Sequence, residues 1–164
     1  MQSGVEVLVK AVLVACVVLA GLAGWVVPRT RWIRQRQVSE RLFVATQAVG
    51  IACGAVGLVL VFAWPLRTLE WHLWELALMP YVLVNVYWII IMRRARSAEI
   101  LDEKQSFNLA SACGLTIGLG MLPMLAAFVL YDRGIFDARL FYPYFLLATV
   151  LILSGTTLFL FRRA

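Results

Sequence analysis

The sequence predicts an all-α fold, a polytopic bundle of five transmembrane helices with the N-terminus outside and the C-terminus inside. Three observations predict it. Of the 164 residues, 63% are hydrophobic and 15% are charged, whereas soluble domains are about 45–50% apolar and about 25% charged. The apolar residues form runs long enough for helices to cross a bilayer core about 30 Å thick. These runs also lack the period-two alternation that barrel strands require.

Five apolar runs are each predicted to form one spanning helix of a single domain over residues 1–164. The first run carries Glu6 and Lys10 near its start, the third carries Glu75 in its first turn, and the other three contain no formal charge. The first run lacks the positive segment that opens a signal peptide, so we expect it to remain as a span. The predicted spans are residues 5–27, 42–66, 73–92, 107–131 and 140–161.

The charges between the runs predict the orientation, because short cytoplasmic loops are rich in Lys and Arg. One side of the predicted membrane includes connections 28–41 and 93–106 and the C-terminus. It holds 11 Lys and Arg and a net charge of +7, whereas the other side holds 4 and a net charge of −1. The first side is therefore expected to be cytoplasmic. The composition as a whole excludes a soluble enzyme, a disordered regulator and a nucleic-acid partner.

Two pairs of predicted helices resemble each other, which indicates an internal repeat. The tripeptide Ala-Cys-Gly stands at 52–54 and again at 112–114, and the dipeptide Pro-Tyr stands at 80–81 and again at 143–144. A genuine duplication predicts two parallel hairpins related by a pseudo-two-fold axis along the membrane normal. Chance similarity between common membrane sequences predicts an asymmetric arrangement.

Small residues four positions apart predict the surfaces on which helices pack. They lie on one face of a helix and let two backbones approach closely, which drives association where lipid removes the hydrophobic difference between helix and surroundings. Contact within the chain is one use of such a face. The seam of a homo-oligomer, or of a hetero-complex with another membrane protein, is the alternative. The predicted helix-packing residues are Ala20, Gly24, Gly50, Gly54, Gly114 and Gly118.

Polar groups at membrane depth are few in this sequence. Glu6, Lys10 and Glu75 all lie in the outer third of a span, where a side chain can reach the interface, and no ionisable residue lies at a midplane. This pattern argues against a proton-driven pump. A transport pathway between the two hairpins, if the protein has one, is predicted to use Glu75, Asn85 and Asn108.

The sequence predicts no metal site and no cofactor. His72 is the only histidine, and it can meet Glu75 at a spacing of three, but two ligands are too few for a metal. The three cysteines form no C-x-x-C pair and are interpreted as small buried side chains. No nucleophile–base pair or phosphate-binding loop is visible, so we predict no catalytic residue.

Basic residues flank the spans on the predicted cytoplasmic side. Such residues are attracted to anionic lipids of the inner leaflet by about 1 kcal/mol each, and a simple topology anchor is the alternative interpretation. The predicted lipid-binding residues are Arg29, Arg31, Arg34, Arg36, Arg93 and Arg94.

An acidic tetrapeptide, Asp-Glu-Lys-Gln at 102–105, stands immediately before the fourth run. Acids at this position favour the helix dipole. The pattern Asp-Glu-x-Gln, followed by a helix rich in small residues and a terminal hairpin, resembles several families of small multi-pass bacterial membrane proteins of unknown function over about residues 97–163. The resemblance implies a prokaryotic origin, hence an inner-membrane location, and a helical hairpin fold. It implies no activity.

Three functions follow from these observations. The leading hypothesis is a non-catalytic integral membrane protein, a subunit or an accessory or assembly factor that packs against partner helices. The alternative is a small transporter or channel with a pathway between the two hairpins. The third is an enzyme that acts on lipid head groups through Asp102 or Glu103.

Overall fold

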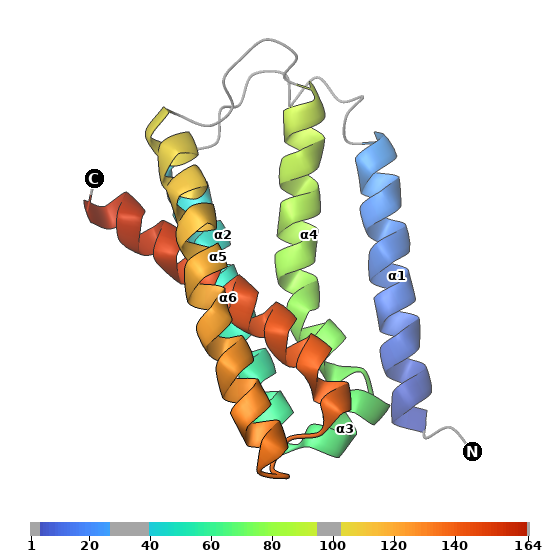
Figure 1. The fold of residues 1–164 in the computed structure, drawn as a ribbon. Coiled ribbons are helices and arrows are strands. Elements are labelled where there is room, and N and C mark those ends of the chain that lie inside the picture. The colour runs from blue at the N-terminus through green and yellow to red at the C-terminus, as the bar shows by residue number, and fades with distance from the viewer. Residues whose placement is uncertain (1–3, 27–39, 95–102, 164) are drawn as a thin grey trace.

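The structure is a computed structural model that describes residues 4–26, 40–94 and 103–163. These residues form helices joined by short turns and contain no strand (Figure 1). The predicted all-α fold is therefore confirmed. The elements are α1 (Gly4–Val26), α2 (Glu40–Ala63), α3 (Pro65–Glu70), α4 (Leu73–Arg94), α5 (Glu103–Asp132), η3 (Ala138–Leu140) and α6 (Phe141–Arg163).

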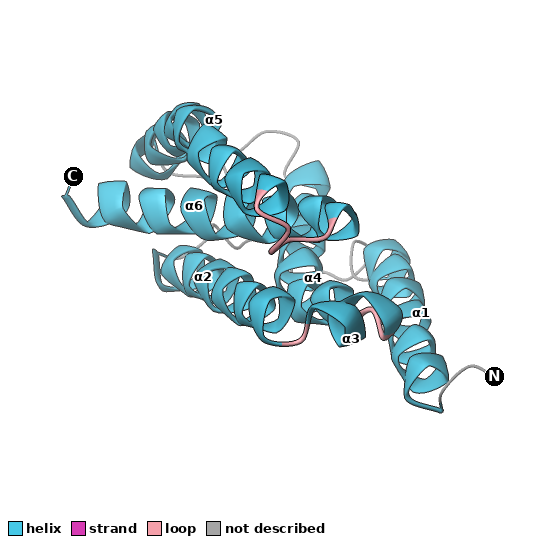
Figure 2. Cartoon of the chain, turned by 60° about the horizontal axis from the view of Figure 1, so that its bottom comes forward, coloured by secondary structure: helices cyan, strands magenta, loops and turns pink. Residues whose placement is uncertain are grey.

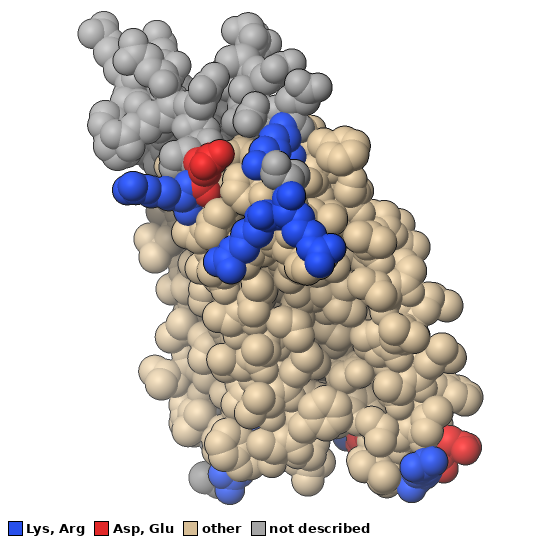
Figure 3. Space-filling view, turned by 90° about the vertical axis from the view of Figure 1, so that its left-hand side faces the viewer, with Lys and Arg blue, Asp and Glu red and all other residues tan. Residues whose placement is uncertain are grey.

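Three helical segments of the described chain are long and apolar enough to cross a membrane. They are Glu40–Ala63, Lys104–Asp132 and Ala138–Arg163, and α1 adds a shorter apolar stretch, Val7–Leu19. The surface agrees with a membrane environment. Figure 3 shows a broad uncharged band on one face, with Lys, Arg, Asp and Glu gathered at its two ends.

Helix boundaries depart from the predicted spans at two places. The second span was predicted to continue through residue 66, but α2 ends at residue 63 and α3 begins with Pro65. Proline has no backbone N–H and disfavours helical backbone at the residue before it, and Trp64 accordingly has φ −138° and ψ 61°. The fourth helix begins at Glu103, four residues earlier than predicted, so part of the acidic tetrapeptide forms its first turn.

The helices form a row in the order α1, α4, α2, α6 and α5. Each helix packs along its neighbours in this order, and Figure 2 shows α6 between α5 and α2, with α1 at the far edge. A pseudo-two-fold repeat requires a contact of α4 with α5 to match that of α2 with α6. No such contact of comparable extent exists among the described residues. The order of the helices therefore favours the alternative of an asymmetric arrangement over two hairpins related by a two-fold axis.

A large apolar core lies near the end of the bundle that holds α3 and η3. Val61, Leu147 and Phe136 are buried there. The Phe136 ring meets the rings of Tyr144 and Phe141 edge to face at 5.5 and 5.6 Å between centroids, a geometry that aromatic pairs favour. Thr68 of α3 is fully buried and donates a hydrogen bond to the Leu60 carbonyl of α2 at 2.8 Å. The core thus secures α3 and η3 against the long helices.

A second, smaller core lies near the other end of the bundle. Phe43 of α2 is buried against Trp88 of α4 and Phe161 of α6, with ring centroids 6.1 and 5.1 Å apart. The Trp88 indole Nε1–H donates to Thr46 Oγ1 at 2.9 Å, and the Thr46 hydroxyl donates to the Leu42 carbonyl at 2.8 Å. This chain of bonds joins α4 to α2 inside an apolar setting.

We predict that Thr46→Val lowers the free energy of unfolding by about 1–3 kcal/mol, because it leaves the buried Trp88 indole N–H without an acceptor. Thr156→Val is the matched control, since the Thr156 hydroxyl bonds only carbonyls of its own helix. Thermal unfolding of the solubilised protein, followed by circular dichroism, measures both. Equal melting temperatures for the two variants would contradict the assignment.

Candidate functional site

The glycines of α2 lie in a close contact with α6. A Cβ built on Gly50 would collide with the Ser154 side chain of α6, and one on Gly54 would lie 3.0 Å from the Leu147 carbonyl oxygen and from the Leu151 Cα. Such distances to backbone atoms leave no room for a side chain. Gly50 and Gly54, two of the predicted helix-packing residues, therefore lie where α2 contacts α6.

Gly57 belongs to the same contact and was not predicted. A Cβ on Gly57 would collide with the Leu147 side chain. The three glycines, at positions 50, 54 and 57, repeat at intervals of four and three, which is the period of one helix face. A search for that period would have found Gly57, whereas a search for pairs four apart stops at Gly54.

We predict that Gly54→Ala lowers the free energy of unfolding by about 1–3 kcal/mol, since a methyl group would overpack the α2–α6 contact. Gly114→Ala is the matched control, because a Cβ there has no neighbour within 4 Å. The measurement is thermal unfolding of each variant as a detergent-solubilised monomer. Loss of stability in both variants, or in neither, would contradict this account of the contact.

The glycines of α5 face away from the bundle. Gly114 and Gly118 are exposed, and a Cβ on either has nothing within 4 Å. The side of α5 that packs on α6 carries Ala112 and Thr116, which are buried. Ala110 is also exposed, so positions 110, 114 and 118 form a row of small residues opposite the α6 contact, here called the outer α5 face. The sequence predicted that these glycines are helix-packing residues, but it did not indicate that they lie on the side of α5 opposite α6.

Several predicted residues lie where the structure gives no side-chain information. Ala20 and Gly24 belong to α1, and Arg93 and Arg94 end α4, but the surroundings of their side chains lie outside the described residues. The same holds for the Glu103 side chain. The whole of Asp102 also lies outside the described residues, as do Arg29, Arg31, Arg34 and Arg36.

The predicted transport residues are not brought together. Asn85 lies on α4, where its amide donates to the Tyr81 carbonyl of the same helix at 2.8 Å. Asn108 is buried on α5, which packs on α6 and makes no extensive contact with α4 in the described chain. Glu75 lies in the first turn of α4, near the α3 end of the bundle. The three side chains therefore line no common path.

Three buried polar atoms have no hydrogen-bond partner within the described part of the molecule: Gln105 Oε1, Asn108 Nδ2 and Ser154 Oγ. Gln105 and Asn108 lie one turn apart on the side of α5 that faces α6, whereas Ser154 lies against Gly50 of α2. A buried polar group without a hydrogen-bond partner lowers the free energy of unfolding by about 1–3 kcal/mol. These atoms mark polar positions in an otherwise apolar bundle.

His72 and Glu75 form an ion-pairing contact at the start of α4. His72 Nδ1 lies 2.9 Å from Glu75 Oε1, as their spacing of three predicted. His72 has φ 54°, the left-handed region that is uncommon for a side chain other than glycine. No group of three His, Cys, Asp or Glu residues that would hold a metal occurs in the described ranges.

The cysteines only partly match the interpretation as buried hydrophobes. Cys53 is buried in α2, Cys16 is partly exposed on α1, and Cys113 is exposed on α5. Buried Cys53 fits the prediction, and exposed Cys113 contradicts it, because the side of α5 that holds Cys113 packs against no other described helix. All three are free thiols.

A comparison of the chain with known protein families, with characterised proteins and with solved structures finds no match. The resemblance of residues 97–163 to small bacterial membrane proteins therefore stays a prediction.

Proposed function

We propose that this chain is a non-catalytic subunit of a membrane assembly, in which two copies pair through the outer α5 face. The observation that carries the proposal is the direction of Gly114 and Gly118. Both point away from every described helix, although α5 is long and apolar enough to cross a membrane. The proposal includes a location in the inner membrane of a prokaryotic cell, as a multi-pass protein with an assembly or accessory role.

Five crossings with the N-terminus outside are part of this proposal. Helices α1 and α4 have 23 and 22 residues; at about 1.5 Å per residue, each is about as long as the bilayer core is thick. The first residue of α1 and the last of α6 lie toward opposite ends of the bundle (Figure 1). The excess of Lys and Arg in the connections then puts the C-terminal end in the cytoplasm.

Lipid contact at the cytoplasmic side is also proposed. Arg162 and Arg163 end α6 and are exposed, and Arg93 and Arg94 end α4. Lys104 Nζ lies 5.1 Å from the centre of the Phe161 ring, at the same end of the bundle. Cations in this position favour anionic headgroups of the inner leaflet. This contact would anchor the chain without giving it an activity.

The α2–α6 contact shows what small residues at this spacing do in this protein. Gly50 and Gly54 bring α6 to within backbone contact of α2. The row Ala110, Gly114 and Gly118 has the same spacing of four but has no described helix against it. Lipid chains gain little from a surface with small residues, whereas a helix gains dispersion contacts and weak Cα–H···O bonds by approaching closely.

A second copy is the occupant that fits this row. Copies in one membrane share one orientation, so their α5 helices run parallel, and the small-residue row meets itself across a two-fold axis along the membrane normal. Parallel dimers with glycines four apart are a known mode of helix pairing in membranes, and an isologous contact of one patch with itself closes as a dimer. The large exposed side chains beside the row, Ile117 and Met121, flank the contact.

We predict that Gly114→Leu combined with Gly118→Leu weakens dimerisation in vesicles by about tenfold or more, because bulky side chains hold the backbones apart. Gly120→Leu is the matched control: it lies on the same helix, outside the row, with open space around a Cβ. Energy transfer between donor- and acceptor-labelled copies, measured against the lipid-to-protein ratio, gives the affinity.

Two results would overturn the proposal. A wild-type chain that stays monomeric at high protein-to-lipid ratios has no self-pairing surface. A wild-type dimer that the double variant leaves unchanged pairs through a different face. Circular dichroism of each variant verifies that the helices themselves are intact.

A further inference from the structure

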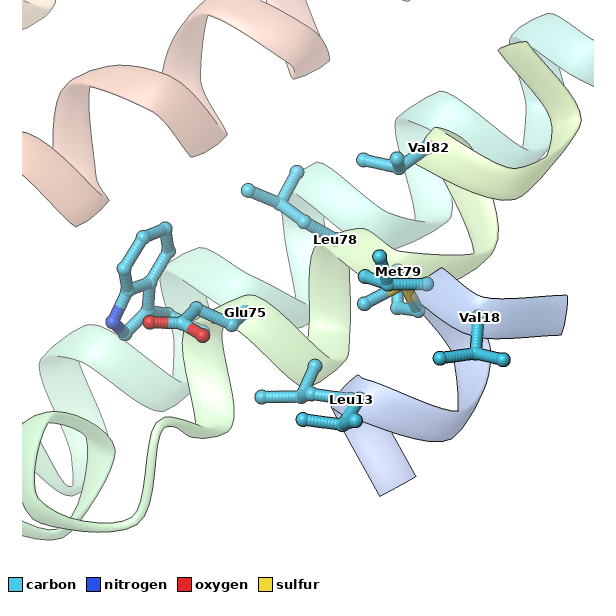
Figure 4. A pocket seen from close by; sticks show the side chains of 9 residues that line it. Leu13, Val18, Glu75, Leu78, Met79 and Val82 are labelled. Carbon is cyan, nitrogen blue, oxygen red and sulfur yellow. The ribbon is translucent and has the colours of Figure 1, made fainter. Parts of the chain in front are cut away.

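A groove runs between α1 and α4 at the opposite edge of the row from α5. Its volume is about 410 Å³, within the range of about 300–1,000 Å³ typical of ligand sites. The walls are aliphatic side chains, with Leu13, Val14 and Val17 on α1 and Leu78, Met79 and Val82 on α4. Figure 4 shows these two helices and the labelled side chains that line the groove. The groove therefore suits a hydrocarbon chain along most of its length.

One end of the groove is charged. Glu75 lies in the groove wall at the start of α4, next to the apolar lining (Figure 4). His72 Nδ1 lies 2.9 Å from Glu75 Oε1, and their side chains are 33% and 38% exposed. A carboxylate has two oxygens and about four acceptor positions, so the bond to His72 leaves Glu75 able to accept from a ligand. The contact also holds the carboxylate in one orientation.

Helix spacing places a cation on the face of α1 that borders the groove. Lys10 is four residues before Val14 and therefore on the same face of α1, one turn farther from the middle of the groove. Helices α1 and α4 run in the same direction along the bundle (Figure 1). Lys10 on α1 and Glu75 on α4 thus provide a positive and a negative charge beside one apolar groove.

We infer that this groove binds a zwitterionic phospholipid with a primary ammonium head, of the phosphatidylethanolamine type. One acyl chain lies between α1 and α4, the ammonium donates hydrogen bonds to Glu75, and the phosphate lies toward Lys10. An anionic lipid without an amine would bring its phosphate close to the carboxylate. A choline head carries its charge without an N–H donor, so it forms no hydrogen bond to Glu75.

The inference goes beyond the proposed function and does not depend on it. The groove and the outer α5 face lie at opposite edges of the row of helices. The dimerisation experiment and the lipid-retention experiment therefore give separate answers. The chain can pair through α5 and show no lipid preference, or it can bind the lipid as a monomer.

The test is the lipid retained by the full chain after reconstitution in vesicles of equimolar phosphatidylethanolamine and phosphatidylcholine with identical acyl chains. Gentle solubilisation followed by mass spectrometry gives the number and kind of lipids bound per protein. We expect phosphatidylethanolamine to be retained about tenfold over phosphatidylcholine, since a charge-assisted hydrogen bond distinguishes the two.

Two variants separate the head group from the chain. Glu75→Gln keeps the size of the side chain and removes its charge, and it is expected to abolish the preference while total retained lipid stays similar. Val17→Trp fills the groove and is expected to lower total retained lipid severalfold. Leu19→Trp is its matched control, because Leu19 lies outside the groove wall on the same helix and is 63% exposed, against 64% for Val17.

The inference is overturned if the wild type retains both lipids equally, or if the preference survives Glu75→Gln. Equal loss of lipid in Val17→Trp and Leu19→Trp would also overturn it, because the groove would then have no special role. Thermal unfolding of each variant verifies that a change in lipid retention does not come from a loss of fold.

Discussion

The structure depends on the close approach of α2 and α6. Apolar side chains are solvated by lipid about as well as by each other, so burial alone does not hold helices together in a membrane. Cohesion then comes from dispersion contacts at short range and from polar groups that pair between helices. Gly50, Gly54 and Gly57 remove the side chains that would keep α6 away from α2. Helix α4 packs on another side of α2, and α5 packs on α6.

The two edges of this row differ in a way that suggests different partners. On α5 the outward row consists of Ala110, Gly114 and Gly118. These residues are small enough for the backbone of another helix to approach closely. On α1 the exposed face carries branched side chains such as Val14 and Val17, which leave a gap against α4. The first surface favours a helix and the second favours a flexible chain. The two proposals thus assign partners of different kinds to the two edges, a second copy of the chain to α5 and a lipid to the groove beside α1.

Sequence patterns located the helices well and their neighbours poorly. Length and apolar character predicted runs close to the observed helices α1, α2, α4, α5 and α6. The largest differences at their boundaries occur at Pro65 and at the acidic tetrapeptide 102–105. The spacing of Gly50 and Gly54 and that of Gly114 and Gly118 are identical, yet the first pair contacts α6 and the second contacts no described helix. Spacing defines a face of a helix, whereas the order of helices in the row decides what that face meets.

For the polar residues too, the sequence predicted contacts within one helix but not contacts between helices. His72 and Glu75 meet because their separation along the chain is one helical turn. Asn85 and Asn108 were grouped from their depth alone, and the row places them on helices that do not pack together. The bond between Trp88 and Thr46 joins residues 42 positions apart, and no local pattern reports it. The repeated tripeptide and dipeptide likewise carried no information about symmetry.

The topology of the chain in a membrane tests the account most directly. The proposed five crossings require the two termini on opposite sides, and the charge asymmetry of the connections favours an N-terminus outside. Epitope tags at each terminus, probed with antibody on intact and then on permeabilised spheroplasts, measure this. We expect the N-terminal tag to be accessible on intact spheroplasts and the C-terminal tag only after permeabilisation. Both tags on one side, or an inverted pair, would contradict the account.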